Sequence, residues 1–422
     1  MEPPPHALRA PSAIYEIGGR RFETASRGFA EAIADAHAAH RRPRCMCLVE
    51  GIEMYVAQLG EGFIVKRMPN TGSHHMPDCP SYEPPAEFSG LGQVLGSAIT
   101  EDLATGETTL KLDFSMSRIA GRSALTVARG ASDSVTTNGT KLSLRGLLHY
   151  LWDQAELTRW QPGFAAKRSW ATVRKHLLLA AEQKIARGGA LDARLCIPEV
   201  FSVDQREAIN ARRLAQLVHA TVTPGKAQNL MLLIAEVKQI VPARYGFKAV
   251  IKHMPDQAFA LDEQLYRRLG RRFEPELSLW GAADNVHMMM IATFGVSAAG
   301  VPTIEELSLM PVTSQWLPIE DSFERQLVEM LVRDGRSFVK GLRYNMPAGH
   351  LLASAILTDS GASPCALFIA RRVADDESAR AVEELARSDL SPAWLWRTDE
   401  GAMPPLPARR RAIGKQLAAA CT

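Results

Sequence analysis

Four side chains of the kind that bind metal ions occur as two close pairs near the start of the sequence. Cys45 and Cys47 form the first pair, in PRCMC, and His75 and Cys79 form the second, in HHMPDC. Protein-bound zinc takes four sulfur or nitrogen donors at the corners of a tetrahedron. Between the pairs, MYVAQLGEGFIVKRM alternates around GEG, which predicts a β-hairpin that carries the second pair back to the first. The sequence therefore predicts a zinc site that organises an N-terminal domain.

This segment leaves two questions open. His74 competes with His75 as the histidine ligand, and His75 is favoured because its spacing from Cys79 matches the second half of familiar zinc fingers. The alternatives to zinc are another metal or redox use, or cysteines that serve only as small buried hydrophobic residues. With four protein donors the zinc would be structural, because a catalytic zinc keeps one position open for water.

Length and composition set the broad class of the protein. A chain of 422 residues is too long for one ordinary core, so two or three domains are expected. The hydrophobic share of 46% and charged share of 23% are typical of a globular protein. The net charge of +3 permits contact with nucleic acid without requiring it. The N-terminus does not resemble a signal peptide, no stretch is long and apolar enough to cross a membrane, and six scattered cysteines make no disulfide framework. We therefore expect a soluble, cytoplasmic protein with no membrane partner.

The order of predicted elements indicates a multidomain α+β protein. Helical spacing in KLSLRGLLHYLWDQAEL and strand patterns in QNLMLLIAEVKQIVP, YGFKAVIKHM and NVHMMMIATFGVS describe its middle. A capped helix, IEDSFERQLVEMLVRDG, precedes strands in SFVKGLRYNM and ASAILTDSGASPCALFIARR, a helix in ESARAVEELARS and a final strand in PAWLWRTDE. We expect a zinc-binding, β-rich domain with a zinc knuckle and β-hairpin over 1–140, a central helical and α/β domain over 141–318, and a small α/β unit over 319–422.

One segment of the middle part combines cations with aromatic rings. RWQPGFAAKRSWATVRKHLLLAA holds Trp160 and Trp170, and Ser169 is a good N-cap for a helix. Cations beside rings suit contacts with phosphates and bases, whereas tryptophan at helical spacing also suits a core covered by arginine and lysine stems. The candidate residues for binding nucleic acid are Arg159, Lys167, Arg168, Arg174 and Lys175.

Two features invite comparison with metal-dependent nucleases of the PD-(D/E)xK type. Glu236 and Lys238 form a Glu-x-Lys motif in a predicted strand, although such a motif is common by chance. The C-terminal unit has a similar layout, with Glu324 on its helix and Asp359 after a strand, but LFIARR lacks the acidic residue of the next strand. A degenerate restriction-endonuclease-like unit and an unrelated α/β unit both remain open, and the second is favoured. No Walker or Rossmann glycine motif occurs.

Four stretches together resemble an uncharacterised family of bacterial proteins encoded on integrative and conjugative elements and plasmids. They are RCMCLVEGIEMYVA, VKRMPNTGSHHMPDCPSYEPP, RWQPGFAAKRSWATVRKHLLLAA and FVKGLRYNMPAGHLLASAILTDSGASPCALFIA. The resemblance implies a mobile-element setting, a zinc-finger-like N-terminus and an activity that is not known. Cys45, Cys47, His75 and Cys79 correspond to the family's apparent metal positions, and the family offers no catalytic residues to carry over.

These observations favour a non-catalytic accessory protein of a mobile genetic element, with structural zinc and with DNA or RNA as its partner. One alternative is an adaptor that joins other mobile-element proteins in a conjugation or regulatory complex. The other is a metal-dependent nuclease that uses Glu236 and Lys238, or the region of Asp359.

Overall fold

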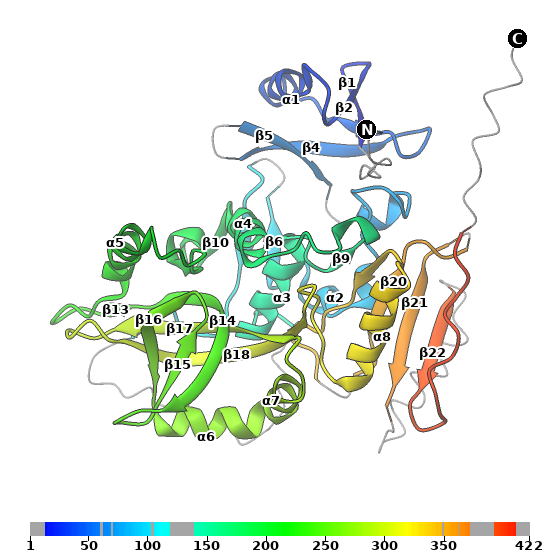
Figure 1. Cartoon of the computed structure of the whole chain (residues 1–422). Helices are drawn as coiled ribbons and strands as arrows, with labels where there is room; N and C mark the ends of the chain where they lie inside the picture. The colour runs from blue at the N-terminus through cyan, green and yellow to red at the C-terminus, as the bar shows by residue number, and fades with distance from the viewer. Residues whose placement is uncertain are drawn as a thin grey trace, which may run out of the picture.

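Several β-sheets with helices packed against them form the described part of the chain, which is mixed α and β as predicted (Figure 1). The computed structural model describes residues 13–59, 62–68, 71–102, 105–118, 139–347, 350–361, 363–371 and 392–410. The predicted helix ESARAVEELARS lies outside these residues. Among the described residues no helix has the length and apolar character needed to cross a membrane.

The N-terminal module, residues 13–85, is built on a sheet with the order β2-β1-β3-β4-β5. Its strands are β1 (Ile14–Ile17), β2 (Arg20–Glu23), β3 (Arg44–Cys45), β4 (Ile52–Leu59) and β5 (Gly62–Arg67). The predicted hairpin is confirmed, since β4 pairs antiparallel with β5. Helix α1 (Phe29–Ala38) packs against β4 and β5 (Figure 1). The core of this module is small and includes Tyr15, Ile33 and Met54.

One face of this sheet carries a row of alternating charges. Arg21 lies opposite Glu16, Glu16 opposite Arg44, and Arg44 opposite Glu53. Arg42 also forms a 3.2 Å ion pair with Glu53. Opposite charges on facing strands stabilise a sheet by a few tenths of a kcal/mol for each pair, roughly, and they compensate one another. The arginines around Cys45 therefore do not form a purely basic surface.

A second sheet joins residues from both sides of the predicted boundary at 140. Its order is β11-β10-β7-β6, and β10 runs parallel to β7. The strands are β6 (Ile99–Glu101), β7 (Thr108–Leu110), β10 (Lys184–Ala186) and β11 (Gly189–Ala190). Helices α3 (Leu144–Gln154) and α4 (Trp170–Ala181) pack in the same large core. The predicted N-cap Ser169 accepts a hydrogen bond from the Thr172 N–H, and Ser143 caps α3 in the same way by accepting from the Gly146 N–H.

The middle of the chain forms a ring of strands. Hydrogen-bonded neighbours run β14-β15-β16-β18-β17, and β17 pairs back with β14. These strands are β14 (Met231–Pro242), β15 (Phe247–Ile251), β16 (Met254–Leu261), β17 (Val286–Val296) and β18 (Pro302–Thr313). Strand β12 (Leu195–Cys196) adds to β14 from outside the ring. We refer to this ring as the barrel. Its last strand, β18, was not predicted from the sequence.

Side chains alternate between the inside and the outside of the barrel. Leu233 and Met290 belong to the inner core, which helix α6 (Glu263–Arg272) also joins through Leu265 and Leu269. Their neighbours along the strands, such as Ile234, face the core shared with α3 and α4. Helix α7 (Glu274–Gly281) follows α6 and leads into β17. Both faces of β14 and β17 are thus buried.

The C-terminal sheet has the order β22-β21-β20-β19-β9. It includes a strand from before the predicted boundary at 318, because β9 pairs antiparallel with β19. Its elements are α8 (Ser322–Arg333), which begins at the N-cap Asp321, and β9 (Arg159–Trp160), β19 (Phe338–Lys340), β20 (Ala353–Leu357), β21 (Cys365–Ala370) and β22 (Ala393–Arg397).

The remaining elements are short, except for one helix. They are α2 (Leu91–Val94), α5 (Arg206–Leu217), β8 (Ser117–Arg118), β13 (Gln228–Asn229) and the 3-10 turns η1 (Gly72–His74), η2 (Ala86–Phe88), η3 (Pro162–Phe164), η4 (Asp192–Arg194) and η5 (Val218–Ala220).

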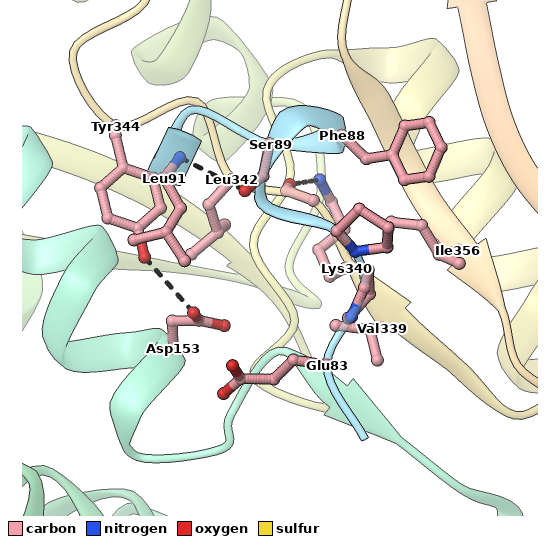
Figure 2. Close-up of a pocket in the computed structure, with 13 residues that line it drawn as sticks. Glu83, Phe88, Ser89, Leu91, Asp153, Val339, Lys340, Leu342, Tyr344 and Ile356 are labelled. Atoms are coloured by element: carbon pink, nitrogen blue, oxygen red, sulfur yellow. Dashed lines mark hydrogen bonds between the residues drawn. The ribbon is translucent and has the colours of Figure 1, made fainter. Parts of the chain in front are cut away.

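A small pocket lies where the connector after the N-terminal module meets α3 and the C-terminal sheet. Figure 2 shows Glu83, Asp153, Lys340 and Tyr344 around it. The Tyr344 hydroxyl lies 3.3 Å from Asp153 Oδ2. The cavity, about 40 Å³, is large enough for a water molecule and too small for an organic ligand. We therefore assign it to the junction between the parts of the chain.

Lys184, in the second sheet, makes stability depend on pH. It is buried, its ammonium donates to Thr108 Oγ1 at 3.1 Å, and burial lowers its pKa to about 8. An unfolded lysine has a pKa of about 10.4, so between these values the unfolded chain binds more protons. The free energy of unfolding should rise between about pH 8 and pH 10, by at most about 1.4 kcal/mol per pH unit. In Lys184→Met the rise in the free energy of unfolding should be smaller, because the variant lacks the proton that Lys184 binds in the unfolded chain. Chemical denaturation of both proteins across this range measures the difference, and parallel curves would contradict the prediction.

Candidate functional site

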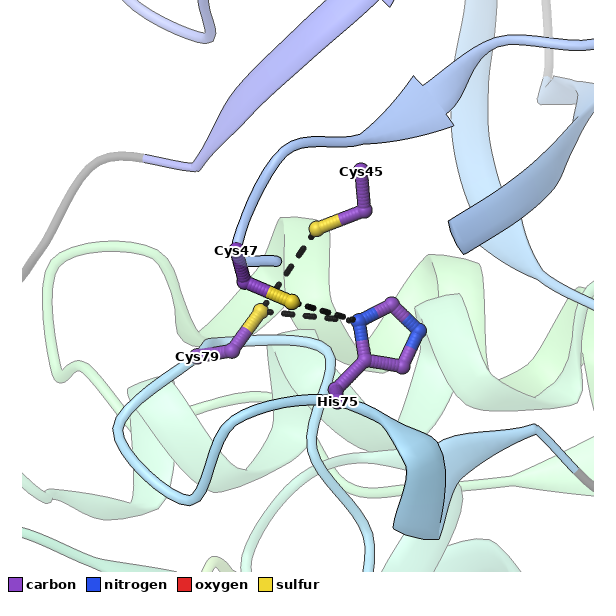
Figure 3. A group of neighbouring side chains, drawn as sticks. All are labelled: Cys45, Cys47, His75 and Cys79. Carbon is purple, nitrogen blue, oxygen red and sulfur yellow. Dashed lines mark hydrogen bonds between the residues drawn. The ribbon is translucent and has the colours of Figure 1, made fainter. Parts of the chain in front are cut away.

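The four predicted metal ligands come together at one edge of the N-terminal module. Cys45 ends β3, and Cys47 lies in the turn that follows. The β4–β5 hairpin then returns the chain, so that His75 comes directly after η1 and Cys79 closes a turn in which its N–H donates to Met76 O. Figure 3 shows the three sulfur atoms and the His75 ring facing a common centre. The predicted proximity of the four residues is confirmed.

The distances between these donors fit a tetrahedral metal ion. Cys45 Sγ lies 3.7 Å from Cys79 Sγ, and His75 Nδ1 lies 3.4 Å from Cys47 Sγ and 3.7 Å from Cys79 Sγ. All four donor atoms lie within 4.8 Å of one another. A tetrahedron with Zn–S bonds of about 2.3 Å and Zn–N bonds of about 2.05 Å has edges of about 3.8 and 3.6 Å. The donors therefore surround a space of the right size for such an ion.

His75, rather than His74, faces the cluster. The His75 side chain is buried and directs Nδ1 toward the sulfurs, while His74 is exposed. The second ring nitrogen, His75 Nε2, is buried without a hydrogen-bond partner among the described residues. The backbone N–H of Ser81 donates to Cys79 Sγ at 3.3 Å, as often happens where a thiolate binds a metal. Of the two histidines, His75 is thus the one whose ring lies in the cluster.

The three sulfurs interact strongly with one another. A hydrogen bond with Cys79, together with burial, raises the pKa of Cys45 well above its usual range. The same bond lowers the pKa of Cys79 to about 4, against the effect of burial. Burial also raises the pKa of Cys47. Three thiolates this close repel one another, so a bound cation would stabilise them by replacing their protons.

The second pair of ligands leads directly into the rest of the protein. Tyr82 O, three residues after Cys79, accepts a hydrogen bond from the Arg159 guanidinium. Arg67, at the end of β5, forms an ion pair with Glu83 and donates to Ser81 O. The turn that carries His75 and Cys79 thus lies between the N-terminal sheet and the strand β9 of the C-terminal sheet.

The predicted basic segment divides into two kinds of residue. Arg168 donates to the carbonyls of Leu157, Arg159 and Gln315 and lies over the rings of Trp160 and Phe164, and burial lowers its pKa to about 10. Arg159 and Arg174 also donate to backbone carbonyls, of Tyr82 and Ile197. By contrast, Lys167 and Lys175 are exposed. The three arginines hold the fold together, and the two lysines are the members available to a partner.

The Glu-x-Lys motif occupies the outside of the barrel. Glu236 is buried, and its Oε1 accepts from Lys252 Nζ at 2.8 Å and lies 2.7 Å from His287 Nδ1. Its Oε2 has no partner among the described residues. Lys238 is exposed and lies at a register shift of β14, not beside Glu236. The carboxylate is thus paired with His287 of β17 and with Lys252, which directly follows β15.

The acidic residues of the C-terminal unit are also paired. Glu324 is buried and accepts from Lys340 Nζ at 2.8 Å. Asp359 accepts from the Arg336 guanidinium at 2.8 Å and from the backbone N–H of Ser337. Both carboxylates therefore have structural partners.

A stack of rings beside Glu236 was not found by sequence reasoning. His287 stacks on Trp316, Trp316 contacts Trp170, and Trp170 stacks on His253. Trp316 adopts a left-handed backbone with φ of 62°, which is unusual for a bulky residue. Nothing local in the sequence indicates this stack, since its rings come from four separate segments. It places the N-terminal end of α4 beside the β15–β16 turn.

Comparisons with known proteins give one match. A family model described as "Protein of unknown function (DUF1173)" matches residues 15–399. Neither the curated proteins nor the solved structures contain a match. The match covers the Cys/His cluster, the barrel and all strands of the C-terminal sheet.

Replacing each of the two adjacent histidines tests the assignment of the ligand. His75→Ala should weaken metal retention at least about tenfold, because it removes a donor from a closed site. His74→Ala should retain metal like the unchanged protein, because this side chain is exposed. The metal content of each variant is measured after gel filtration in a buffer that contains a weak chelator. Equal loss in the two variants would contradict the assignment.

Proposed function

The chain belongs to the family of proteins of unknown function DUF1173, and from this premise we propose that it is a zinc-containing, non-catalytic accessory protein that binds nucleic acid. A family without a known activity leaves function to be argued from the sites themselves. The observation that carries the zinc part is the tetrahedral set of Cys45, Cys47, His75 and Cys79.

The chemistry of the donors favours zinc over other ions. Three thiols and an imidazole are soft and borderline ligands, which suit zinc and are poor ligands for magnesium or calcium. Bound zinc would stabilise the thiolates and would link the turn of Cys45 and Cys47 to the turn of His75 and Cys79. We assign it a structural role, because the four protein donors fill a tetrahedral coordination shell and leave no position for water.

The small core of the N-terminal module supports this role. The sheet and α1 enclose few large side chains, and the ligands Cys45 and Cys79 are themselves part of the core. Small domains with such cores commonly depend on a metal or disulfides for stability. The zinc site would thus keep the module folded and its connection to β9 in place.

The nucleic-acid part of the proposal rests on the exposed lysines at α4. Lys167 precedes the N-terminal end of this helix, and Lys175 lies on its exposed side. A helix N-terminus carries partial positive charge and free N–H groups, so lysine beside it suits a phosphate. The setting in a mobile genetic element is proposed from the sequence resemblance.

A protein–protein adaptor is the second candidate, and one observation favours it. Val49 is 95% exposed and Leu48 is 38% exposed, at the tip of the turn that follows Cys47. An apolar tip held by a metal site is suited to insertion into a partner protein. This surface would bind in a manner that depends little on salt.

Elemental analysis tests the zinc proposal. The purified protein should contain about one zinc per chain, and Cys79→Ser should lower this content and the melting temperature. Cobalt substitution should give the intense visible absorption of a tetrahedral site with sulfur ligands. A metal-free protein of unchanged stability would overturn the proposal.

Charge reversal tests nucleic-acid binding at α4. The double variant Lys167→Glu, Lys175→Glu should weaken binding of a labelled oligonucleotide at least about tenfold at moderate salt, and should reduce the salt dependence of the binding constant. The matched control is Arg27→Glu, Lys111→Glu, which changes the charge equally at exposed positions elsewhere. Fluorescence anisotropy over a salt series measures both. Equal weakening in the control would show that only net charge matters.

A further inference from the structure

The order of strands in the barrel is itself informative. Three strands, β14, β15 and β16, follow one another as antiparallel neighbours, helices α6 and α7 come next, and β17 and β18 form an antiparallel pair. The ring closes through β14 with β17, antiparallel, and β16 with β18, parallel. This is the connectivity of the five-stranded oligonucleotide/oligosaccharide-binding barrel, the OB-fold, whose second and third strands form the binding face. The corresponding strands here are β15 and β16.

The first strand adds a second point of likeness. Strand β14 pairs with β15 over its second half and with β17 over its first half, and its register shifts between Val237 and Gln239. Bulges of this kind bend a strand so that it can belong to two sides of a small barrel. The barrel is thus closed by curvature of its longest strands.

The outer face of β15 and β16 is open and basic. On β15, Ala249 and Ile251 point into the barrel, which turns Lys248 and Val250 outward, and Lys248 is exposed. On β16, Phe259 and Leu261 point into the barrel, and the residues on either side of Phe259, the small Ala258 and Ala260, point outward. Small side chains leave the backbone of the face accessible, and Lys248 is the exposed cation on it.

The turn between β14 and β15 places an aromatic ring at the end of this face. Tyr245 is 80% exposed, and the Arg244 guanidinium lies 5.4 Å from the centre of its ring. Gly246 follows with φ of 76°, and a Cβ there would lie 2.6 Å from Leu261 O, so the turn requires glycine. An exposed tyrosine held in a defined turn beside arginine suits stacking on an unpaired base.

Three carboxylates around this face have ion-pair partners, whereas Asp262, beside Gly246, accepts only from the Leu265 N–H, at 2.6 Å, among the described residues. Asp256 pairs with Arg213, Glu263 with Arg267, and buried Glu236 with Lys252 and His287. Among the described residues neither Arg244 nor Lys248 forms an ion pair. The open charge on the face is therefore positive, which complements a phosphate backbone.

We propose that the β15–β16 face of the barrel binds single-stranded nucleic acid, with Lys248 and Arg244 at phosphates and Tyr245 stacked on a base. The inference rests on the proposed nucleic-acid binding and names its form and its surface. The Trp170–His253 stack brings the N-terminal end of α4 to the β15–β16 turn. The strand would therefore run along β15 from Tyr245 toward Lys167. Single strands are favoured because stacking needs bases that are not paired.

Binding by the full-length, zinc-loaded protein tests this inference. The probes are fluorescent oligo(dT), oligo(rU) and a DNA duplex of equal length, measured by anisotropy at several salt concentrations. The unchanged protein should bind at least one single strand about tenfold more tightly than the duplex. Tyr245→Ala and Lys248→Glu should each weaken single-strand binding about tenfold, with unchanged melting temperature. The controls are Tyr245→Phe, which keeps the ring and should bind normally, and Lys111→Glu.

The outcomes separate this inference from the proposed function. If the unchanged protein binds no nucleic acid, both are overturned. If Lys167→Glu, Lys175→Glu weakens binding while Tyr245→Ala and Lys248→Glu do not, the proposed function stands and the barrel surface is overturned. Equal affinity for duplex and single strands overturns the single-strand assignment. Loss of binding in Tyr245→Phe as well as in Tyr245→Ala overturns the stacking role.

Discussion

The burial of both faces of β14 and β17 is the constraint on which the rest of the protein depends. All residues from Met231 to Val237 are buried, as is almost all of β17. One face of this strand pair lines the inside of the barrel, and the other packs against α3 and α4. Removing this much apolar surface from water is the main stabilising contribution that the structure offers. The second sheet and helices α3 and α4 share the core on its outer face, and α6 joins the core inside the barrel.

Because so much of this region is buried, charged side chains near the barrel need partners. A carboxylate at Glu236 cannot be buried without partners, and Lys252 and His287 supply them from the neighbouring strands. The same rule holds at Glu324 with Lys340. The two carboxylates that suggest catalysis in the sequence thus have their buried charge balanced by neighbouring side chains.

The N-terminal module buries less apolar surface than the barrel does. Its core is small, its sheet shows one face with paired charges to solvent, and two of its metal ligands belong to its core. Burial of apolar surface contributes less in such a unit, so a bound metal ion would have a larger share in its stability. The body of the protein is held by apolar packing, and the module is suited to be held by coordination.

Local patterns account for what could be predicted. The hairpin between the metal pairs, the α8 helix with its Asp321 cap and most buried strands follow from side-chain period and turn residues. The closing of the barrel could not be predicted, because the pairs β14–β17 and β16–β18 join segments far apart in the chain. For the same reason β9, predicted as part of a helical domain, pairs in the C-terminal sheet.

The candidate site shows the same division. The sequence by itself determined the metal cluster, since Cys45, Cys47, His75 and Cys79 carry their chemistry and spacing within one short segment. It also determined that cations gather near Trp160 and Trp170. Only the tertiary structure decided that Arg159, Arg168 and Arg174 bind backbone carbonyls while Lys167 and Lys175 stay exposed. Only it, too, decided that Tyr245 and Lys248 are exposed while Ala249 and Ile251 point into the barrel, because burial depends on contacts with residues that the sequence keeps far apart.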